Sequence, residues 1–269
     1  MSQPTEDVTL DPDSPGMYAA LPDGSWMPTM HVQGAWRPDE QHMAPVTGII
    51  AEAIARHEPR EELQLARLSC DILGVMPATP FTVDVRTTRP GRTIELVQAE
   101  MVSGGRTVVR AQAWRLSRQD SAEAEGVALE GMPGPDAFEP WDGMTGIWDG
   151  GYIADLEARR DPEAVPGRAR VWYRSPRTLV ADQDCSPVAD FVRLIDTANG
   201  SATRVSPKEW MFPNVDLTIH LLREPVPGWV GLDIRQSIGS TGTGLTSTVL
   251  HDSKGPVGTA EQILTVRKF

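Results

Sequence analysis

The sequence predicts an α+β protein made of two tandem copies of one unit, in which a helix packs against an antiparallel sheet. Two observations carry this prediction. One helix followed by four strands occurs twice in the same order, and both helices open with Pro-Val, at Pro45 and Pro187. The strand segment Arg67–Ser69 also precedes the similar segment Asp216–Thr218 by 149 residues. Two such units pair most readily edge to edge in one continuous sheet, because this hides an edge strand of each.

The chain has 269 residues, enough for two domains, and its 40% hydrophobic and 23% charged residues are typical of a globular protein. A net charge of −12 argues against a nucleic-acid partner, although a local arginine cluster could still bind an anionic small ligand. No apolar run reaches the about 18 residues of a membrane span, and the first 30 residues lack a signal-peptide core. We therefore expect a cytoplasmic protein with Cys70 and Cys185 as reduced thiols.

The first unit is predicted to span 36–118, after an N-terminal extension over 1–35. Apolar residues at helical spacing predict a helix over Pro45–His57, with the proline in its first turn. Runs rich in Val, Ile and Thr predict the strands Ala66–Leu73, Phe81–Thr88, Thr93–Val102 and Thr107–Leu116.

Residues 119–168 are predicted to be a linker and an irregular segment. The stretch Ser121–Gly134 is small, acidic and contains Gly and Pro. It is followed by Trp141, Trp148 and Tyr152. Because exposed aromatic side chains in a linker would be costly, we expect this part to pack back onto a domain.

The second unit is predicted to span 169–269 and to repeat the first. Its helix is expected over Pro187–Gly200. Its strands are expected at Val215–Leu222, Trp229–Ser237, Gly244–Leu250 and Val257–Val266. Gln112 precedes Gln262 by 150 residues, which suggests matched glutamines on the last strand of each copy.

Three segments resemble the tandem, or double, hotdog acyl-coenzyme A thioesterases, the group of bacterial thioesterase II. They are the stretch from Trp36 into the Pro45 helix, Leu194–Gly200, and Phe212–His220 with Arg223 downstream. The closing run Gly255–Gln262 fits as well. The resemblance implies a hotdog fold, in which a long helix is wrapped by an antiparallel sheet and the acyl chain lies in a tunnel near the helix.

In that family an aspartate on the second helix, a Thr or Ser on the next strand and a glutamine on the last strand orient the water and the thioester. The matching catalytic positions here are Asp196, Asn214 and Gln262. Asn214 departs from the family's hydroxyl, although an amide can also orient a water. Asp190, on the same helix, is the rival for the aspartate.

The chemistry of these residues suits thioester hydrolysis, which needs an acceptor for the water proton and a donor for the developing oxyanion. Burial beside an apolar helix face would raise the pKa of Asp196, as a base requires. Gln262 could equally make a structural hydrogen bond across the sheet.

Five further residues are candidates for substrate binding, each with an alternative. Asn199 lies in the Asp196 segment. Asp216 shares a strand face with Asn214, Thr218 and His220, which either lines a site or faces solvent. His42 could act in the site or cap its helix. Met43 stands where the family has glycine and would crowd the helix N-terminus.

Arg89 is the fifth candidate: with Arg86 and Arg92 it forms a cluster at a turn that could hold coenzyme A phosphates or simply be solvated. Aligning Pro45 with Pro187 places Ile54 opposite Asp196. This alignment predicts that only the second copy keeps a carboxylate and hence a site.

The sequence therefore predicts hydrolysis of acyl-coenzyme A by an Asp-activated water, with no metal and no cofactor other than the coenzyme A of the substrate. The expected partners are the acyl-coenzyme A and a second copy of the chain, as a dimer of double hotdogs. The alternative is a degraded hotdog that binds acyl groups or serves in assembly, favoured by Met43 and Asn214. A hydratase is less supported, since no histidine follows Asp196 closely.

Overall fold

The first half of the chain forms one long helix and four long strands. In the computed structural model, which describes residues 10–269, helix α1 spans Met43–Arg56. The strands are β3 (Leu63–Ile72), β4 (Phe81–Arg89), β5 (Ile94–Ser103) and β6 (Arg106–Ser117). The predicted helix and all four predicted strands of this half are therefore confirmed, with ends that differ by up to three residues.

Helix α1 lies inside the molecule. All its residues from Met43 to Ile54 are buried, and Thr47 and Glu52 are the polar ones among them. It begins at His42, whose Nδ1 accepts a hydrogen bond from the amide of Ala44 at 3.1 Å. Pro45 stands in the first turn, where a missing N–H costs nothing.

The second half repeats the four strands, but its helix is broken. The strands are β12 (Asp216–Leu221), β13 (Val230–Ile238), β14 (Thr243–Asp252) and β15 (Gly255–Thr265), close to the predicted runs. The predicted continuous helix over Pro187–Gly200 is instead three short helices: α3 (Pro187–Val192), the 3-10 helix η4 (Ile195–Thr197) and α4 (Ala198–Ser201).

Side-chain hydroxyls explain this break. The carbonyl of Arg193 accepts a hydrogen bond from the Tyr152 hydroxyl at 2.9 Å, and the carbonyl of Leu194 accepts one from the Thr197 hydroxyl. These carbonyls are thereby bound to hydroxyls, and helices often bend where a side chain inserts into the hydrogen-bond ladder. The chain between α3 and α4 turns, and the turn carries Asp196.

The remaining elements extend the sheet at its ends or lie beside it. They are β1 (Gly16–Ala20), β2 (Trp26–Pro28), η1 (Met30–Val32), η2 (Ala122–Ala124), η3 (Pro135–Ala137), β7 (Glu139–Pro140), α2 (Gly151–Ala154), β8 (Glu157–Arg160), β9 (Arg168–Arg174), β10 (Thr178–Val180), β11 (Trp210–Met211) and β16 (Arg267–Lys268). The predicted extension thus contains strands, and the predicted linker contains strands and a short helix. We keep the unit boundaries 36–118 and 169–269 as a proposal.

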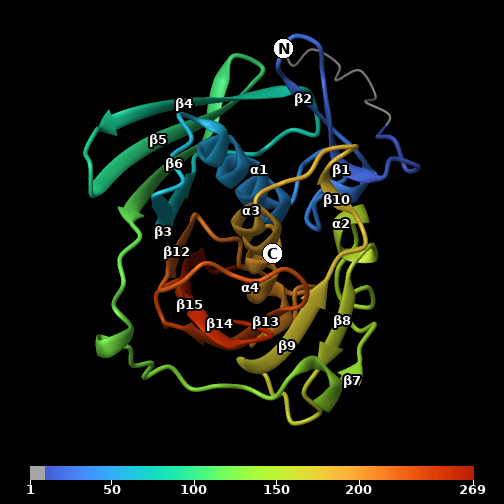
Figure 1. The fold of residues 1–269 in the computed structure, drawn as a ribbon. Coiled ribbons are helices and arrows are strands. Elements are labelled where there is room, and N and C mark those ends of the chain that lie inside the picture. The colour runs from blue at the N-terminus through green and yellow to red at the C-terminus, as the bar shows by residue number, and fades with distance from the viewer. Residues whose placement is uncertain (1–9) are drawn as a thin grey trace.

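One 14-stranded sheet joins the two halves, in the order β10-β1-β2-β4-β5-β6-β3-β12-β15-β14-β13-β9-β8-β7. Its centre is symmetric, because β4-β5-β6-β3 of the first unit meets β12-β15-β14-β13 of the second. Figure 1 shows the sheet curling around α1 on one side and around α3 and α4 on the other, with these helices in the middle. The predicted α+β double hotdog is confirmed. In the described part of the chain, no helix is long and apolar enough to cross a membrane.

The sheet register corrects the pairing of Gln112 with Gln262. On the two central strands, Ser69 corresponds to Thr218, and these residues pair with Gln112 and Glu261 respectively. Gln112 therefore corresponds to Glu261, and both differ from the buried Gln262 in facing outward. The prediction of matched glutamines was wrong by one residue, and a slip of one residue exchanges the two faces of a strand.

Candidate active site

A cavity of about 510 Å³ lies at the N-terminal end of α1, between the two units. Its lining includes the start of α1, the turn after α3, the strand ends near β11 and part of the segment before α2. Among the predicted site residues, five line it: His42, Met43, Asp196, Asn199 and Asn214.

Asp196 is the centre of the polar groups in this cavity. Its Oδ1 accepts hydrogen bonds from Asn214 Nδ2 and from Gln262 Nε2, both at 2.8 Å. The three predicted catalytic residues, from the turn after α3, from the segment just before β12 and from β15, therefore meet at one oxygen. Asp190, the rival carboxylate, instead pairs with Arg193 at 2.7 Å and does not line the cavity.

Burial dominates the ionisation of Asp196. Removal from water raises the pKa of this carboxyl from 3.8 to about 7, while the hydrogen bonds from Asn214 and Gln262 act in the opposite direction. An acid with a pKa near neutrality can accept a proton and return it within one reaction cycle. Its second oxygen, Oδ2, receives no hydrogen bond from the described residues.

His42 lies opposite that free oxygen, with its Nδ1 3.6 Å from Asp196 Oδ2. Since Nδ1 already accepts the amide proton of Ala44, the neutral ring carries its proton on Nε2. Burial lowers the pKa of His42 to about 4, so the ring is uncharged at neutral pH. The ring also packs on Tyr152, with centroids 4.5 Å apart. The sequence left two roles open for His42, in the site or as a helix cap. In the structure it caps α1 and also lines the cavity.

Asn214 reaches Asp196 because of a β-bulge. Thr218 pairs with Glu261, yet Asn214 pairs with Leu264, so one extra residue lies on the β12 side. The bulge turns Asn214 inward and leaves Val215 42% exposed. The prediction that Asn214 shares a face with Asp216, Thr218 and His220 was therefore wrong for Asn214.

Asp216, predicted to bind substrate, does not line the cavity. Its Oδ1 accepts a hydrogen bond from the amide of Ile263 at 2.6 Å. At the bulge, the carboxylate thus accepts the hydrogen bond that a backbone carbonyl would accept in a regular strand pair. Asn199 does line the cavity, but its side chain is engaged at both ends: Nδ2 donates to the carbonyl of Phe212, and Oδ1 accepts from Gln236.

Arg89 is also outside the cavity. Its Nη1 donates to the carbonyl of Ile94 at 2.7 Å, within its own turn. Two other arginines line the cavity and were not singled out in the sequence. Arg37 is bound to Asp39 through two hydrogen bonds. Arg267 forms no ion pair with any of the described residues, and its guanidinium donates one hydrogen bond, to the sulfur of Met211.

The comparison of Ile54 with Asp196 was wrong. Helix α1 begins after His42 and α3 begins after Ser186, so Pro45 and Pro187 stand at different positions in their helices. Counted from these caps, Glu52 is the residue that corresponds to Asp196. Both copies therefore keep a buried carboxylate, and the difference between them lies in its partners.

Sequence analysis missed the contribution of the middle segment. Met144, Trp148 and Ile153 line the cavity, and Tyr152 packs behind His42. The only signal was the cluster of aromatic residues after Ser121–Gly134, which we expected to pack back onto a domain. They do so at the site itself. Within residues 10–269, no group of His, Cys, Asp or Glu is arranged to hold a metal ion.

Comparisons with known structures show the same fold over most of the chain. The structure is similar to a hotdog-fold protein of unknown function from Alicyclobacillus acidocaldarius, at a TM-score of 0.72 and 15% identity, covering 90% of this chain and 93% of that one. A Thermobifida fusca protein provisionally described as a thioesterase II has a TM-score of 0.72 and 16% identity, and the match covers 97% of this chain and 99% of that one. An acyl-CoA thioesterase II from Mycobacterium marinum has a TM-score of 0.62 and 18% identity, and the match covers 84% of this chain and 90% of that one. No curated protein sequence matches.

The family match covers both units. Residues 32–116 match the acyl-CoA thioesterase N-terminal domain, and residues 129–266 match the acyl-CoA thioesterase C-terminal domain. These two matches include the helix and the four long strands of each half, together with Asp196, Asn214 and Gln262. The chain therefore belongs to the acyl-CoA thioesterase family.

Proposed function

We propose that this chain hydrolyses acyl thioesters of coenzyme A, with Asp196 activating the attacking water. The observation that carries the proposal is the unequal use of the two oxygens of this carboxyl group. Two amide donors fix Oδ1, whereas Oδ2 keeps its lone pairs for a water in the cavity. A fixed carboxylate with one free oxygen and a pKa of about 7 suits a general base.

His42 helps to keep that base competent. A protonated histidine at 3.6 Å would hold Asp196 in its ionised form and weaken it as a base. Because burial lowers the pKa of His42 to about 4, its ring stays neutral while Asp196 titrates. The neutral ring therefore leaves the lone pairs of Oδ2 that face the cavity available to a water.

The start of α1 can stabilise the oxyanion. Partial positive charge accumulates at a helix N-terminus, and its first amides have no partners within the helix. The amide of Ala44 is capped by His42 and Pro45 has no N–H, which leaves the amide of Met43 as the donor at the start of the first turn. Met43 lines the cavity, so its backbone N–H is our candidate for the oxyanion.

The proposed reaction proceeds through a tetrahedral intermediate. The water oxygen attacks the thioester carbonyl carbon while Oδ2 of Asp196 takes one of its protons. The carbonyl oxygen becomes an oxyanion that accepts a hydrogen bond from the Met43 amide. When the carbon–sulfur bond breaks, the proton on Asp196 passes to the departing thiolate, which yields a free acid and a thiol.

Arg267 supports coenzyme A as the thiol component. It is exposed at the cavity and lacks a carboxylate partner among residues 10–269, in a chain of net charge −12. A guanidinium in this position can pair with a phosphate of coenzyme A. We propose Arg267 for this contact in place of Arg89.

Release of thiol from a panel of acyl-coenzyme A esters tests the proposal, with Asp196→Asn as the key variant. We expect hydrolysis of at least one ester by the unaltered chain. Asp196→Asn should lose about 10²- to 10⁴-fold in kcat, the usual contribution of a general base. If no ester releases thiol, or if the variant keeps full activity, the chain is not a thioesterase of this kind; binding of an ester without release would indicate the degraded hotdog.

A further inference from the structure

The cavity has an exposed end and a buried end. Arg267, Val75 and Phe269 form the exposed end, where Val75 is 51% and Phe269 is 70% accessible. Met144, Trp148 and Ile153 form the buried end, and Trp148 is only 7% accessible. Asp196 is buried as well, and it lines the same cavity as these apolar side chains.

The buried end is built by a segment from between the two units, residues 142–155, which we call the cap. The cap supplies Met144, Trp148 and Ile153 to the cavity. Trp148 is held in a fixed orientation, since its Nε1 donates to the carbonyl of Gly200 at 3.1 Å. Its ring also meets Trp36 edge to face at 4.8 Å and Phe212 at 5.8 Å. The indole therefore forms a rigid wall.

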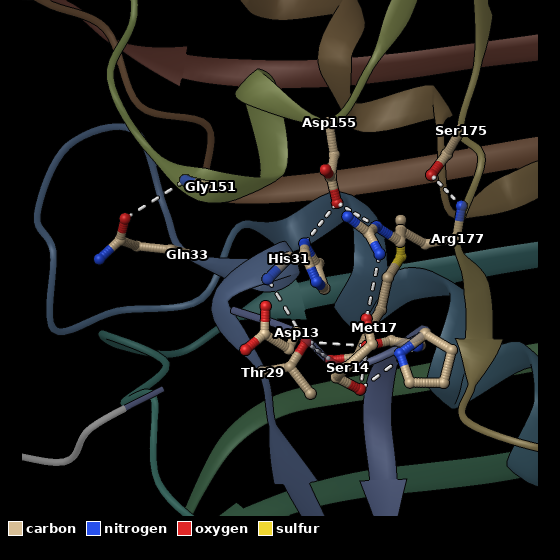
Figure 2. A network of polar contacts seen from close by, with 12 residues as sticks. Asp13, Ser14, Met17, Thr29, His31, Gln33, Gly151, Asp155, Ser175 and Arg177 are labelled. Carbon is tan, nitrogen blue, oxygen red and sulfur yellow. Dashed lines mark hydrogen bonds and ion pairs between the residues drawn. The ribbon is translucent and has the colours of Figure 1, made fainter. Parts of the chain in front are cut away.

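Polar contacts attach the cap to residues 30–34. Figure 2 shows Gln33, whose side-chain oxygen accepts a hydrogen bond from the amide of Gly151 at 3.2 Å, and Asp155, which pairs with His31 at 2.5 Å. Arg177 also pairs with Asp155, at 3.1 Å. These contacts fix the cap at the end that follows Trp148.

Glycine is required at the same junction. Gly150 has φ of +106°, and a Cβ there would lie 2.5 Å from the carbonyl oxygen of Gly34. A Cβ on Gly151 would collide with the carbonyl oxygen of Met30. The two glycines thus let the cap approach the backbone of residues 30–34, which places Trp148 over the cavity.

We propose that Trp148 closes the acyl end of the site and limits the length of acyl chain that the protein accepts. The charged phosphates of coenzyme A cannot be buried among apolar side chains without a large cost, so they remain at the exposed end beside Arg267. The apolar acyl group then points past Asp196 toward Met144, Trp148 and Ile153. The preferred substrates are apolar acyl chains that end at the indole. This inference rests on the proposed thioesterase activity.

The test compares straight-chain acyl-coenzyme A esters of increasing length with the unaltered protein and with Trp148→Ala. Removing the indole extends the buried end, so the length giving the highest kcat/KM should increase by two carbons or more. The ratio of kcat/KM for long over short esters should rise about tenfold. Trp148→Phe keeps a ring and should shift the optimum less.

Trp172→Ala is the matched control. Trp172 is a buried tryptophan whose Nε1 also donates to a backbone carbonyl, that of Pro133 at 2.9 Å, but it does not line the cavity. Its replacement should lower Tm as Trp148→Ala does, with an unchanged length profile. Gly200→Ala tests the reverse effect, because Gly200 lines the cavity and its added Cβ, 3.0 Å from Trp148 Nε1, would narrow the buried end beside the indole. It should shorten the optimum.

The outcomes separate the two proposals. If the unaltered protein releases thiol from no ester, the thioesterase proposal fails. If it is active but Trp148→Ala, Trp148→Phe and Gly200→Ala all keep its length profile, the thioesterase proposal stands and the role of Trp148 is wrong. Should Trp148→Ala not fold, Trp148→Phe and Gly200→Ala decide the question by themselves.

Discussion

Asp196 and Glu52 occupy equivalent positions in the two units, each beside the N-cap residue of the other unit's helix. Glu52 lies ten residues after His42, the N-cap of α1, and Asp196 lies ten residues after Ser186, the N-cap of α3. Glu52 accepts a hydrogen bond from the amide of Ser186, the cap of α3, at 2.8 Å, while Asp196 lies 3.6 Å from His42, the cap of α1. Duplication therefore left two buried carboxylates related by the symmetry of the sheet.

Their partners differ. Glu52 also pairs with Arg56 at 2.7 Å, so its charge is neutralised and both its oxygens are occupied. Asp196 has only the amides of Asn214 and Gln262 on one oxygen. We expect Glu52→Ala to lower the free energy of unfolding by about 1–3 kcal/mol, since the partly buried amide of Ser186 loses its acceptor. Denaturant unfolding measures this, and kcat/KM should be unchanged. Loss of activity without loss of stability would show that the first unit takes part in the reaction.

Asp196→Asn should stabilise the protein at neutral and higher pH while it lowers activity. The folded state raises the pKa of Asp196 from 3.8 to about 7, so it binds more protons than the unfolded state between these values. Stability therefore falls as pH rises from about 4 to 7, by at most about 4 kcal/mol, and this penalty is constant above pH 7. The asparagine has no such penalty. Its Tm should exceed that of the unaltered protein at pH 8 but not at pH 4. An equal difference in Tm between the variant and the unaltered protein at pH 4 and at pH 8 would contradict a raised pKa of Asp196.

The activity should depend on pH through the same group. Asp196 must be ionised to take a proton from water, so kcat/KM should rise with pH and level off above about 7. His42, with its pKa lowered to about 4, contributes no step in this range. A pH–rate profile measures the inflection. An inflection near pH 4 would mean that Asp196 is not buried in the working enzyme.

Gln262→Ala should move that inflection to higher pH. The Gln262 amide stabilises the charged carboxylate, so its loss raises the pKa of Asp196 further. At pH 7 the variant should be less active, and a higher pH should restore part of the loss. Gln112→Ala is the control, since Gln112 is exposed on the sheet and does not line the cavity. Its profile should match that of the unaltered protein.

Arg267→Gln should weaken the binding of coenzyme A esters but not of pantetheine esters, which lack the phosphates. One ion pair at an exposed position is worth about 1 kcal/mol, so KM should rise about fivefold for the coenzyme A ester with little change in kcat. The difference should shrink at high salt. Arg89→Gln, which alters the turn after β4, should leave both values unchanged. An equal rise in KM for both esters would rule out a phosphate contact.

The sequence determined the elements and the fold class by itself. Alternation of apolar residues and turn residues between the runs placed all eight long strands within three residues of their observed ends, because these patterns are local. The repeated order of elements then predicted two similar units, and the resemblance to the acyl-coenzyme A thioesterases implied the double hotdog. The resemblance of the Asp196 segment pointed to residues that the structure brings together at one oxygen.

Only the tertiary structure decided what surrounds that oxygen. A one-residue bulge turned Asn214 inward, a hydroxyl from Tyr152 helped to break the second helix, and the helix caps rather than the prolines set the correspondence of Glu52 with Asp196. The segment 142–155, which carries Trp148, lies in a stretch of the sequence without periodicity. Such features depend on contacts between residues far apart in the chain, which leave no local pattern in the sequence.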